Sequence, residues 1–551
     1  MCVNPYRSVI LAVLTPVASV FAADRVSVFT KQLPGREAAA WEVEVVTRGE
    51  VESRVLDSEG DLVAGPFAAK RFAVAGTKAW SAEKPVWYTL VTESDGERKE
   101  TVFGFAEQVI RGGRLYVNGR PVRVKAGPKA LNGNAASLRD LTQEEAWKTG
   151  VYRLSASQLK RIGAETPAGN DAATKYRFRD WTVKSTNYAS RIVVANRNAF
   201  TDGSEVELRW TLLVDGEEED SGEIDLLGLP PGAEAAFDMP EEVTEARGED
   251  GSVSVRFSFL RGGEVVAEDQ LDLVASRVAN ALNPPEGWLR AHTPGWFKSS
   301  VSCEVEQGDV DQVRVFRTGG PFSRGVKFEF DEMEGLPKSF VKRGRIYDSA
   351  VAGAFALRSD NGSGESSLGI VYPPSPVETR GGAHTFVTLR GGDGVVGAAR
   401  WTVYPNGIVS CRARLHSATA EPGTRLGFAM RLAEDDEDLE WYGLGPLATS
   451  KGDVEGAFLG RWEADGPEEF SAERVRGLRY GDLTVRTLGA PFSFKLTTCT
   501  VEARTVKDLA VFGEPGRDGV VELSFTLSVD DSELTARAPD GADDLPSLNN
   551  L

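Results

Sequence analysis

The sequence predicts an all-β protein in which two small β-sandwiches precede a larger one, with a short helical join between the first two. Apolar and polar residues alternate in short segments over most of the chain, as in half-buried strands. Clusters of Gly, Asn, Asp and Pro separate those segments at short intervals, as turns do. Between the first two sandwiches, residues 126–172 depart from this pattern, because they are rich in Ala, Gly and Asn and carry helix-start signals.

The composition is that of an ordinary globular protein and argues against nucleic acid as a partner. The chain has 551 residues, of which 41% are hydrophobic and 26% are charged. This length is enough for about three or four domains. The formal net charge is −19 and the pI is near 4.9, whereas phosphate binding needs a basic face. We therefore expect no nucleic-acid partner and interpret the acidic runs as solvated loops.

Residues 1–22 are predicted to be a secretory signal peptide. Arg7 gives a positively charged start, and residues 9–20 form an apolar core that is too short to span a bilayer. Cleavage after Ala22 would yield an exported protein, periplasmic or extracellular, and no later segment is apolar for long enough to form a membrane span. The mature chain would keep three cysteines: Cys303, Cys411 and Cys499. Their odd number leaves at least one thiol free.

Residues 24–125 are predicted to form an Ig-like β-sandwich. Residues 41–46 alternate as a strand does, and residues 57–61 and 94–97 have the composition of hairpin turns. Short strands separated in this way are typical of a sandwich of about 100 residues.

Residues 126–172 are predicted to contain two short helices. Two pairs of residues have the spacing of a capping box: Thr142 with Glu145, and Ser155 with Gln158. In a capping box, the hydroxyl and the carboxylate or amide each accept a hydrogen bond from an otherwise unpaired backbone N–H group. Gly150 and Gly163 would end the two helices.

The rest of the chain is predicted to form two further β-sandwiches. Residues 173–275 alternate again, with a turn at Asp215 and Gly216, and we expect a second Ig-like β-sandwich. Residues 276–297 are predicted to be a linker. Residues 298–535 are rich in strand patterns, with a hairpin turn at residues 405–407, and we expect one large C-terminal β-sandwich. Residues 536–551 are predicted to be a flexible tail.

Motif searches identify no cofactor or metal site. Residues 392–397 match the glycine pattern of a dinucleotide site, but a strand pattern follows where that site needs a helix. The chain has three scattered histidines: His292, His384 and His416. Their spacing is not that of zinc ligands, so we expect no metal and no cofactor. The carboxylates are too numerous for their spacing to single out a catalytic pair.

Trp441 and Tyr442 are the best candidates for a platform on which a sugar ring would stack. Gly443, Gly445 and Pro446 follow them and indicate a loop, where an aromatic ring could be exposed. Core packing is the alternative, and it is the commoner role of tryptophan.

Several segments resemble, in the same order, those of the large β-galactosidases among the family-two glycoside hydrolases. Residues 80–90 (WSAEKPVWYTL) resemble a strand of the family's Ig-like domain, and residues 196–216 are similar to its second Ig-like domain. Residues 440–446 (EWYGLGP) resemble a loop of its galactose-mutarotase-like C-terminal β-sandwich, and residues 358–361 (RSDN) resemble a worn copy of that domain's R-P-DND segment. The resemblance adds two residues to the carbohydrate-binding candidates Trp441 and Tyr442, namely Arg358 and Asp360. We predict that Arg358, Asp360 and Trp441 come together in space.

The departures from this family concern its catalytic part. In the family, a (β/α)₈ barrel of about 250–300 residues lies between the Ig-like domains and carries both catalytic glutamates, whereas only residues 126–172 fill that place here. The family's acid/base glutamate follows an asparagine, and this chain contains no Asn-Glu dipeptide. The N-terminal sugar-binding domain is also expected to be absent, because the predicted signal peptide leads almost directly into the first Ig-like domain. We therefore expect no catalytic residue in this chain and no activity of the chain alone.

Three functions are consistent with these features. The first is a secreted, non-catalytic relative of β-galactosidase that binds a galactoside or a galactose-containing polysaccharide. The second is an accessory subunit of a split β-galactosidase whose barrel is on another chain. The third is a structural scaffold without a sugar site. Exposed aromatic residues on the last sandwich would favour the first function, and a last sandwich filled by its own side chains would favour the third.

Overall fold

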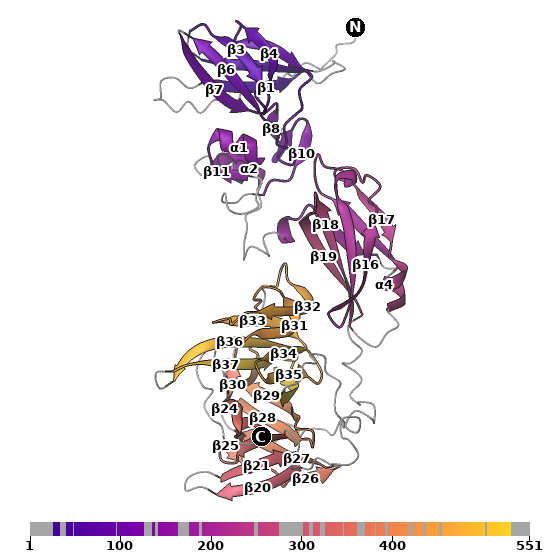
Figure 1. Ribbon diagram of the computed structural model, residues 1–551, viewed down its shortest axis with the longest axis vertical. Coiled ribbons are helices and arrows are strands. Elements are labelled where there is room, and N and C mark those ends of the chain that lie inside the picture. The colour runs from indigo at the N-terminus through magenta and orange to yellow at the C-terminus, as the bar shows by residue number, and fades with distance from the viewer. Residues whose placement is uncertain are drawn as a thin grey trace, which may run out of the picture. The chain divides into compact units, whose positions relative to one another are not determined.

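The computed structural model describes residues 26–274 and 301–529, with short gaps in both ranges (Figure 1). The gaps are residues 34–39, 48, 95, 126–134, 138–140, 164–175, 187–189, 247–251, 308–311, 320–324, 345–346, 361–369, 381, 392–394, 418–422, 434–436, 451–453 and 502–503. The predicted signal peptide, linker and tail lie outside the described residues. The described chain consists mostly of antiparallel strands, which confirms the all-β prediction.

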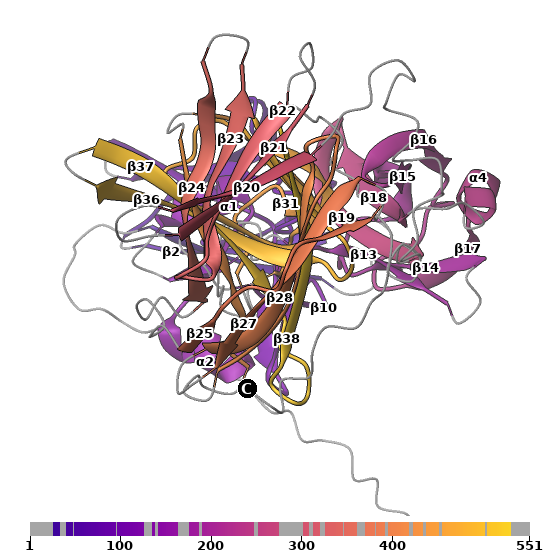
Figure 2. The same cartoon turned by 90° about the horizontal axis from the view of Figure 1, so that it is seen from below.

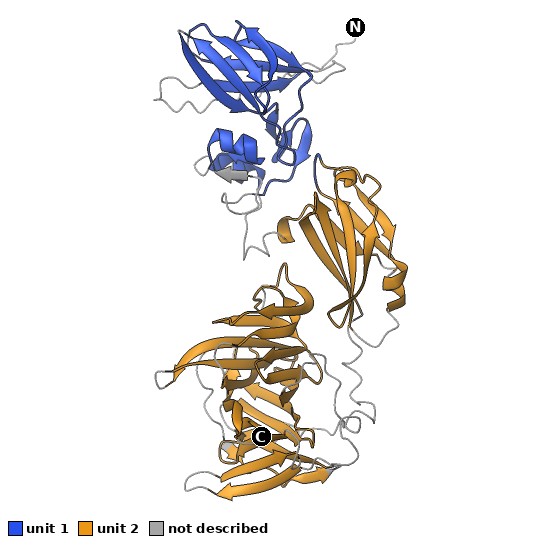
Figure 3. Ribbon diagram, viewed as in Figure 1, with its two compact units in different colours: residues 1–167, 198–200 blue, residues 168–197, 201–551 orange. Residues whose placement is uncertain are grey.

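The chain forms two compact units (Figure 3). Residues 1–167 and 198–200 make up the first unit, and residues 168–197 and 201–551 make up the second. The domain limits expected from the sequence are finer than this division and stay a prediction. None of the helices in the described ranges is long and apolar enough to cross a membrane.

The first unit begins with a sandwich of two antiparallel sheets. One sheet has the order β1-β2-β5, and the other has the order β4-β3-β6-β7. The strands are β1 (Ser27–Gln32), β2 (Ala40–Val46), β3 (Glu52–Leu56), β4 (Leu62–Phe67), β5 (Arg71–Ala75), β6 (Tyr88–Ser94) and β7 (Glu97–Phe103). Alternate residues such as Trp41, Val43 and Leu90 point inward and form the core between the sheets.

A second small core of the first unit contains the helical join. Its elements are β8 (Gln108–Arg111), β9 (Arg114–Val117), β10 (Arg120–Val122), β11 (Ala135–Ser137), α1 (Gln143–Thr149), β12 (Tyr152–Leu154) and α2 (Ala156–Ile162). Both predicted capping boxes are present, and Gly150 and Gly163 end the helices in the left-handed conformation, with φ of 71° and 58°. The two predicted helices are therefore confirmed in position and in capping.

Trp80 is the centre of this second core. Its indole ring is completely buried and lies edge-on to the rings of Trp147 (4.8 Å) and Tyr152 (5.6 Å). Its Nε1 donates a hydrogen bond to the carbonyl oxygen of Trp147 at 2.9 Å. Gly104 leaves room for the ring, since a Cβ there would lie 2.8 Å from Trp80 atoms. The join is thus folded against a residue of the segment that resembles the family's Ig-like domain.

The second unit begins with another small sandwich. Its sheets have the orders β13-β14-β17 and β16-β15-β18-β19. The elements are β13 (Trp181–Ser185), β14 (Arg191–Asn196), η1 (Gly203–Glu205), β15 (Glu207–Val214), β16 (Glu217–Ile224), β17 (Glu234–Asp238), α4 (Glu241–Glu245), β18 (Val253–Arg261) and β19 (Glu264–Val274). Asp215 and Gly216 form the predicted turn, with φ of 50° and 82°, as a tight hairpin requires.

The large sandwich consists of a nine-stranded and a ten-stranded antiparallel sheet. The nine-stranded sheet has the order β20 (Val301–Gln307), β21 (Gln312–Thr318), β22 (Gly325–Asp331), β23 (Leu336–Arg343), β24 (Ser349–Ser359), β30 (Leu426–Leu432), β37 (Arg504–Gly513), β36 (Phe492–Val501), β33 (Phe470–Val475). Figure 2 shows β21, β22, β23 and β24 of this sheet side by side. Each strand of this sheet contributes its inward residues to one core shared with the other sheet.

The ten-stranded sheet covers the other side of that core. Its strands are β25 (Ile370–Tyr372), β26 (Glu378–Arg380), β27 (Ala383–Gly391), β28 (Val395–Val403), β29 (Val409–Ser417), β38 (Val521–Val529), β35 (Leu483–Thr487), β34 (Gly477–Tyr480), β31 (Leu439–Gly445) and β32 (Phe458–Ala464). Trp401 of β28 is fully buried and lies edge-on to Phe428 of the opposite sheet at 5.7 Å. A strand was expected after the glycine pattern of residues 392–397, and β28 is that strand. The turn expected at residues 405–407 joins β28 to β29.

Candidate functional site

Trp441 lies in the core and not on an exposed loop. It belongs to β31, has no exposed surface, donates a hydrogen bond from Nε1 to the carbonyl oxygen of Leu444 (3.0 Å) and packs 4.7 Å from the ring of Phe470. The expectation that Trp441 offers an exposed stacking surface is therefore wrong. The expectation failed because the following glycines allow close packing and do not form a loop. A Cβ at Gly443 would lie 2.8 Å from the Val475 side chain, and one at Gly445 would lie 2.5 Å from Trp462, so both glycines allow close packing of strands.

Tyr442 is also buried, with 1% of its surface exposed. Its ring lies under the turn between β15 and β16, because a Cβ at Gly216 would approach the ring to 2.8 Å. Arg461 holds the same turn through an ion pair with Glu217 at 2.6 Å. Burial raises the pKa of Tyr442, although a hydrogen bond with Ser252 opposes this rise. The expected exposed ring is thus absent here too, and Tyr442 packs against the smaller sandwich of the second unit.

Arg358 and Asp360 lie on a different face from Trp441. Phe355 and Leu357 of β24 point into the core, so Arg358 lies on the outer face of the sheet by alternation. Asp360 follows the last residue of β24 and binds Arg425. The predicted convergence of Arg358, Asp360 and Trp441 is therefore wrong, because the core separates the first of these residues from the last.

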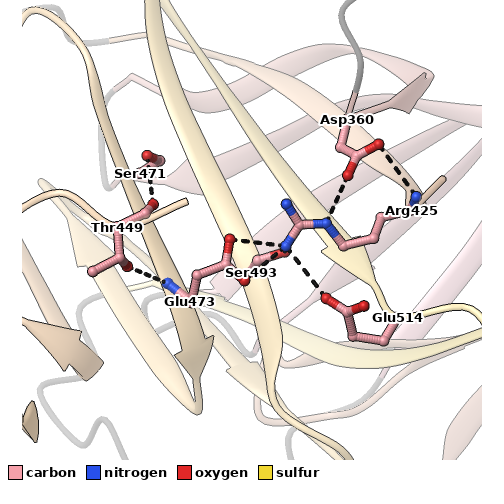
Figure 4. Close-up of polar contacts among 7 residues, drawn as sticks. All are labelled: Asp360, Arg425, Thr449, Ser471, Glu473, Ser493 and Glu514. Atoms are coloured by element: carbon pink, nitrogen blue, oxygen red, sulfur yellow. Dashed lines mark hydrogen bonds and ion pairs between the residues drawn. The ribbon is translucent and has the colours of Figure 1, made fainter. Parts of the chain in front are cut away.

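Asp360 is instead part of a cluster of polar residues around Arg425, which we call the Arg425 cluster (Figure 4). The Arg425 Nε atom donates to Oδ2 of Asp360 at 2.8 Å. Its Nη1 atom lies 2.7 Å from the nearer carboxylate oxygen of Glu473, 2.7 Å from Oγ of Ser493 and 3.3 Å from Oε1 of Glu514. One guanidinium thus binds three carboxylates and a hydroxyl.

The residues of the Arg425 cluster come from one end of five neighbouring strands. The register of these strands pairs Ser359 with Leu426, Leu426 with Gly513, Ser493 with Phe512, and Phe494 with Ala472. The cluster residues lie at or next to these positions in β24, β30, β37, β36 and β33. The neighbours Leu426, Phe492 and Phe494 belong to the core, so Arg425 and Ser493 point to the outer face of the sheet.

A β-bulge directs Glu473 into the cluster. The pairing of β33 with β36 shifts between Ala472 and Val475, which both belong to the core, and Arg474 between them has a φ of +53°. A positive φ is strained for a residue other than glycine, and such strain is often found at functional positions. Thr449 supports the bulge, since its Oγ1 accepts a hydrogen bond from the Glu473 N–H group at 2.9 Å.

The cluster carries excess negative charge and has one open side. One arginine and three carboxylates give a formal charge of −2. Burial lowers the pKa of Arg425, but hydrogen bonds and charges of Glu473 and Asp360 together outweigh it, so the pKa is raised. The side chains of Arg425, Asp360 and Glu473 are 8%, 15% and 11% exposed, whereas that of Glu514 is 59% exposed. Glu514 can therefore accept hydrogen bonds from hydroxyl groups in solution while it is still bound to Arg425.

The cluster is not a metal centre. Its carboxylates converge on the guanidinium, and in the part of the chain that the structure describes no group of three or more His, Cys, Asp or Glu residues has the arrangement of metal ligands. Four of its members were not identified from the sequence: Arg425, Glu473, Ser493 and Glu514. Each occupies an ordinary polar position beside core residues, and only Asp360 carried a signal, through the resemblance of residues 358–361.

Comparison with protein families identifies two segments of the second unit. Residues 192–274 match the family model "Beta-galactosidase, domain 4", and residues 376–474 match "Beta galactosidase small chain". Both are β-galactosidase domains outside the catalytic barrel, in agreement with the resemblance seen in the sequence. The second segment includes Trp441, Arg425 and Glu473.

The solved structures that resemble parts of this chain include β-glucuronidases. A β-glucuronidase from Ruminococcus gnavus in complex with D-glucaro-d-lactam is 20% identical, with 28% of this chain and 32% of that chain covered and a TM-score of 0.20. A β-glucuronidase from an uncultured Clostridium sp. is 14% identical, with 24% and 28% covered and a TM-score of 0.20. This chain therefore spans about a third of the length of these structures. No curated protein matches the chain.

The substitution Arg425→Met is expected to destabilise the large sandwich by about 3–5 kcal/mol, because it leaves the buried Glu473 without a cation. Urea unfolding followed by circular dichroism measures this loss. The control is Arg317→Met, which removes more exposed ion pairs with Glu304 and Glu306 and should cost no more than about 1 kcal/mol. Equal losses in the two variants would show that the Arg425 cluster contributes no more than a surface ion pair.

Proposed function

We propose that this chain is a non-catalytic accessory chain of a β-galactosidase whose catalytic barrel is on a separate chain. The observation that carries the proposal is the structure of the join. Where the family has a barrel of about 250 residues, this chain has a small core of α1, β12 and α2 around Trp80. The two matched segments support the proposal, since both are β-galactosidase domains outside the barrel and one is described as a small chain.

The Arg425 cluster does not supply the missing catalytic groups. Glycoside hydrolysis with retention needs one carboxylic acid that gives a proton and one carboxylate that attacks the sugar. Asp360 and Glu473 both accept charge-assisted hydrogen bonds from the same guanidinium. This arrangement favours the ionised form of both groups, so neither is suited to donate a proton. This chemistry supports a role in binding or assembly and argues against hydrolysis by this chain alone.

Carbohydrate binding is a second candidate function, and the exposure of Glu514 favours it. Arg425 fixes the carboxylate of Glu514 at the outer end of the sheet, where its oxygen atoms face solvent. A fixed carboxylate is a good acceptor for the hydroxyl groups of a sugar. The binding surface would then lie at the Arg425 cluster and not at Trp441 or Tyr442, whose burial gives them the packing role.

The assembly proposal predicts that β-galactosidase activity appears only when two chains are mixed. The purified chain alone should not hydrolyse nitrophenyl β-galactoside, and it should form a complex with a barrel-containing chain from the same genome that lacks these sandwiches. Light scattering measures the complex and nitrophenol release measures the activity. A barrel chain whose acid/base glutamate is replaced by glutamine is the control, because it should assemble without hydrolysis. Activity of this chain alone, or no complex at micromolar concentrations, would contradict the proposal.

We also propose that the chain is exported and processed after Ala22. The support is the charge and hydrophobic pattern of residues 1–22. Expression of the full sequence in a bacterial host should give a protein in the periplasm or medium whose first residue is Ala23, as N-terminal sequencing would show. A cytoplasmic product that keeps residues 1–22 would refute export.

Sugar binding at the Arg425 cluster predicts a specific effect of Glu514→Gln. The wild-type chain should give a calorimetric signal with lactose or a galactose-containing polysaccharide, and the variant should bind about tenfold more weakly because a charged acceptor is lost. The matched control is Glu522→Gln, since Glu522 is also exposed and lies 3.3 Å from an arginine, Arg414, on the other sheet. Equal affinity of the wild-type chain and Glu514→Gln would place any sugar site elsewhere.

A further inference from the structure

A cavity lies at the opposite end of β24 and β30 from the Arg425 cluster. It has a volume of about 140 Å³ and is lined by both sheets of the large sandwich. The residues that line it include Lys342, Ser349, Ala350, Val351, Leu432 and Asp482. We call it the Lys342 cavity. The two sites are roughly 30 Å apart along β24, since about ten residues separate them at 3.3 Å each.

The polar lining of the Lys342 cavity comes from two sheets. Lys342 of β23 and Ser349 of β24 are direct partners in the antiparallel register, so their side chains lie on the same face. Asp482 belongs to the tight turn between β34 and β35 of the other sheet, where Gly481 has a φ of +53°. The Lys342 Nζ atom donates to Oδ2 of Asp482 at 2.9 Å, and this ion pair bridges the two sheets at the cavity.

The size of the cavity fits one six-membered ring. A protein cavity of about 150 Å³ is known to hold a benzene molecule, so about 140 Å³ leaves room for the ring atoms of one pyranose, whose hydroxyl groups would extend to the open, polar side. The side chains of Lys342 and Asp482 are 25% and 39% exposed, so the polar part of the lining is open to a ligand from solvent. The ligand would therefore be a monosaccharide-sized molecule or the terminal unit of a chain.

The chemistry of the lining selects a neutral, polyhydroxylated ring. Val351 and Leu432 are buried and supply apolar surface for the carbon face of a ring. Lys342 supplies donors, Asp482 supplies acceptors and Ser349 supplies a hydroxyl group, the set that adjacent hydroxyl groups of a sugar need. One ammonium and one carboxylate balance each other in charge, whereas a phosphate site would carry excess positive charge.

We propose that the Lys342 cavity binds one pyranose ring, either a free monosaccharide or the terminal residue of a glycan. The proposal is independent of the assembly with a barrel chain, and it concerns a site distinct from the Arg425 cluster. In this proposal, Lys342 and Asp482 form hydrogen bonds with the ligand's hydroxyl groups, and the apolar residues of the cavity contact its ring.

Calorimetry and saturation-transfer NMR of the full chain with D-galactose, D-glucose and methyl β-D-galactoside test this proposal. Asp482→Asn should weaken binding about tenfold through loss of a charged acceptor. Ser349→Leu should abolish binding, since Ser349 lines the cavity at an exposed position on the same face as Lys342, where a larger side chain fills space without disturbing the core. Lys327→Met is the matched control, because Lys327 is 24% exposed and ion-paired with Glu329 but lies outside the cavity lining.

Three results would overturn the proposal. The first is no saturable binding of any of the three sugars by the wild-type chain. The second is sugar binding that Ser349→Leu and Asp482→Asn leave unchanged. If Glu514→Gln abolishes that binding, the site is the Arg425 cluster. The third is preferential binding of inorganic phosphate, measured in the same way, because it would show that the cavity selects an anion. Thermal melting of each variant shows whether the variant is folded. If one of the two cavity variants does not fold, the other still tests the proposal.

Discussion

The ion pairs and hydrogen bonds of Arg425 tie together the ends of five strands of the large sandwich. Removal of a guanidinium from water is costly, and only well-placed partners offset that cost. Those partners are Asp360, Glu473 and Ser493, which are 65, 48 and 68 residues from Arg425 in the chain. They meet only when β24, β30, β37, β36 and β33 pair in one register, so we infer that the cluster specifies the register of the sheet. Slippage of one strand by one residue would turn its member of the cluster into the core.

The first unit shows how a chain with β-galactosidase-like sandwiches is completed without a barrel between them. Trp80 is covered by α1 and β12, and the nearby carboxylate of Glu83 accepts hydrogen bonds from the N–H groups of Ala199 and Phe200 at 2.6 and 2.9 Å. The segment that resembles the family's Ig-like strand therefore stabilises the join and residues 198–200. The join therefore buries the apolar surface of Trp80 within the first unit.

The sequence was informative wherever neighbouring residues determine the structure. The capping boxes at Thr142 and Ser155 and the turn at Asp215 depend on residues within four positions, and all were predicted correctly. Gly443 was misinterpreted because a glycine in a loop and a glycine that admits a distant side chain look alike in sequence. Val475, which that glycine accommodates, is on another strand. The Arg425 cluster escaped prediction for the same reason, since no local pattern links Arg425 to its partners.

The filled core decides where a ligand can bind to the large sandwich. Trp401 and Trp441 have no exposed surface, so these rings offer no platform to a ligand between the sheets. Polar side chains can reach solvent and a ligand at the strand ends, where pairing stops. One end presents Glu514, held by a buried arginine, and the other presents a cavity bridged by Lys342 and Asp482. The rigid sheets hold the two ends at a fixed separation, so a ligand or partner chain at one end can be tested by substitutions that leave the other intact.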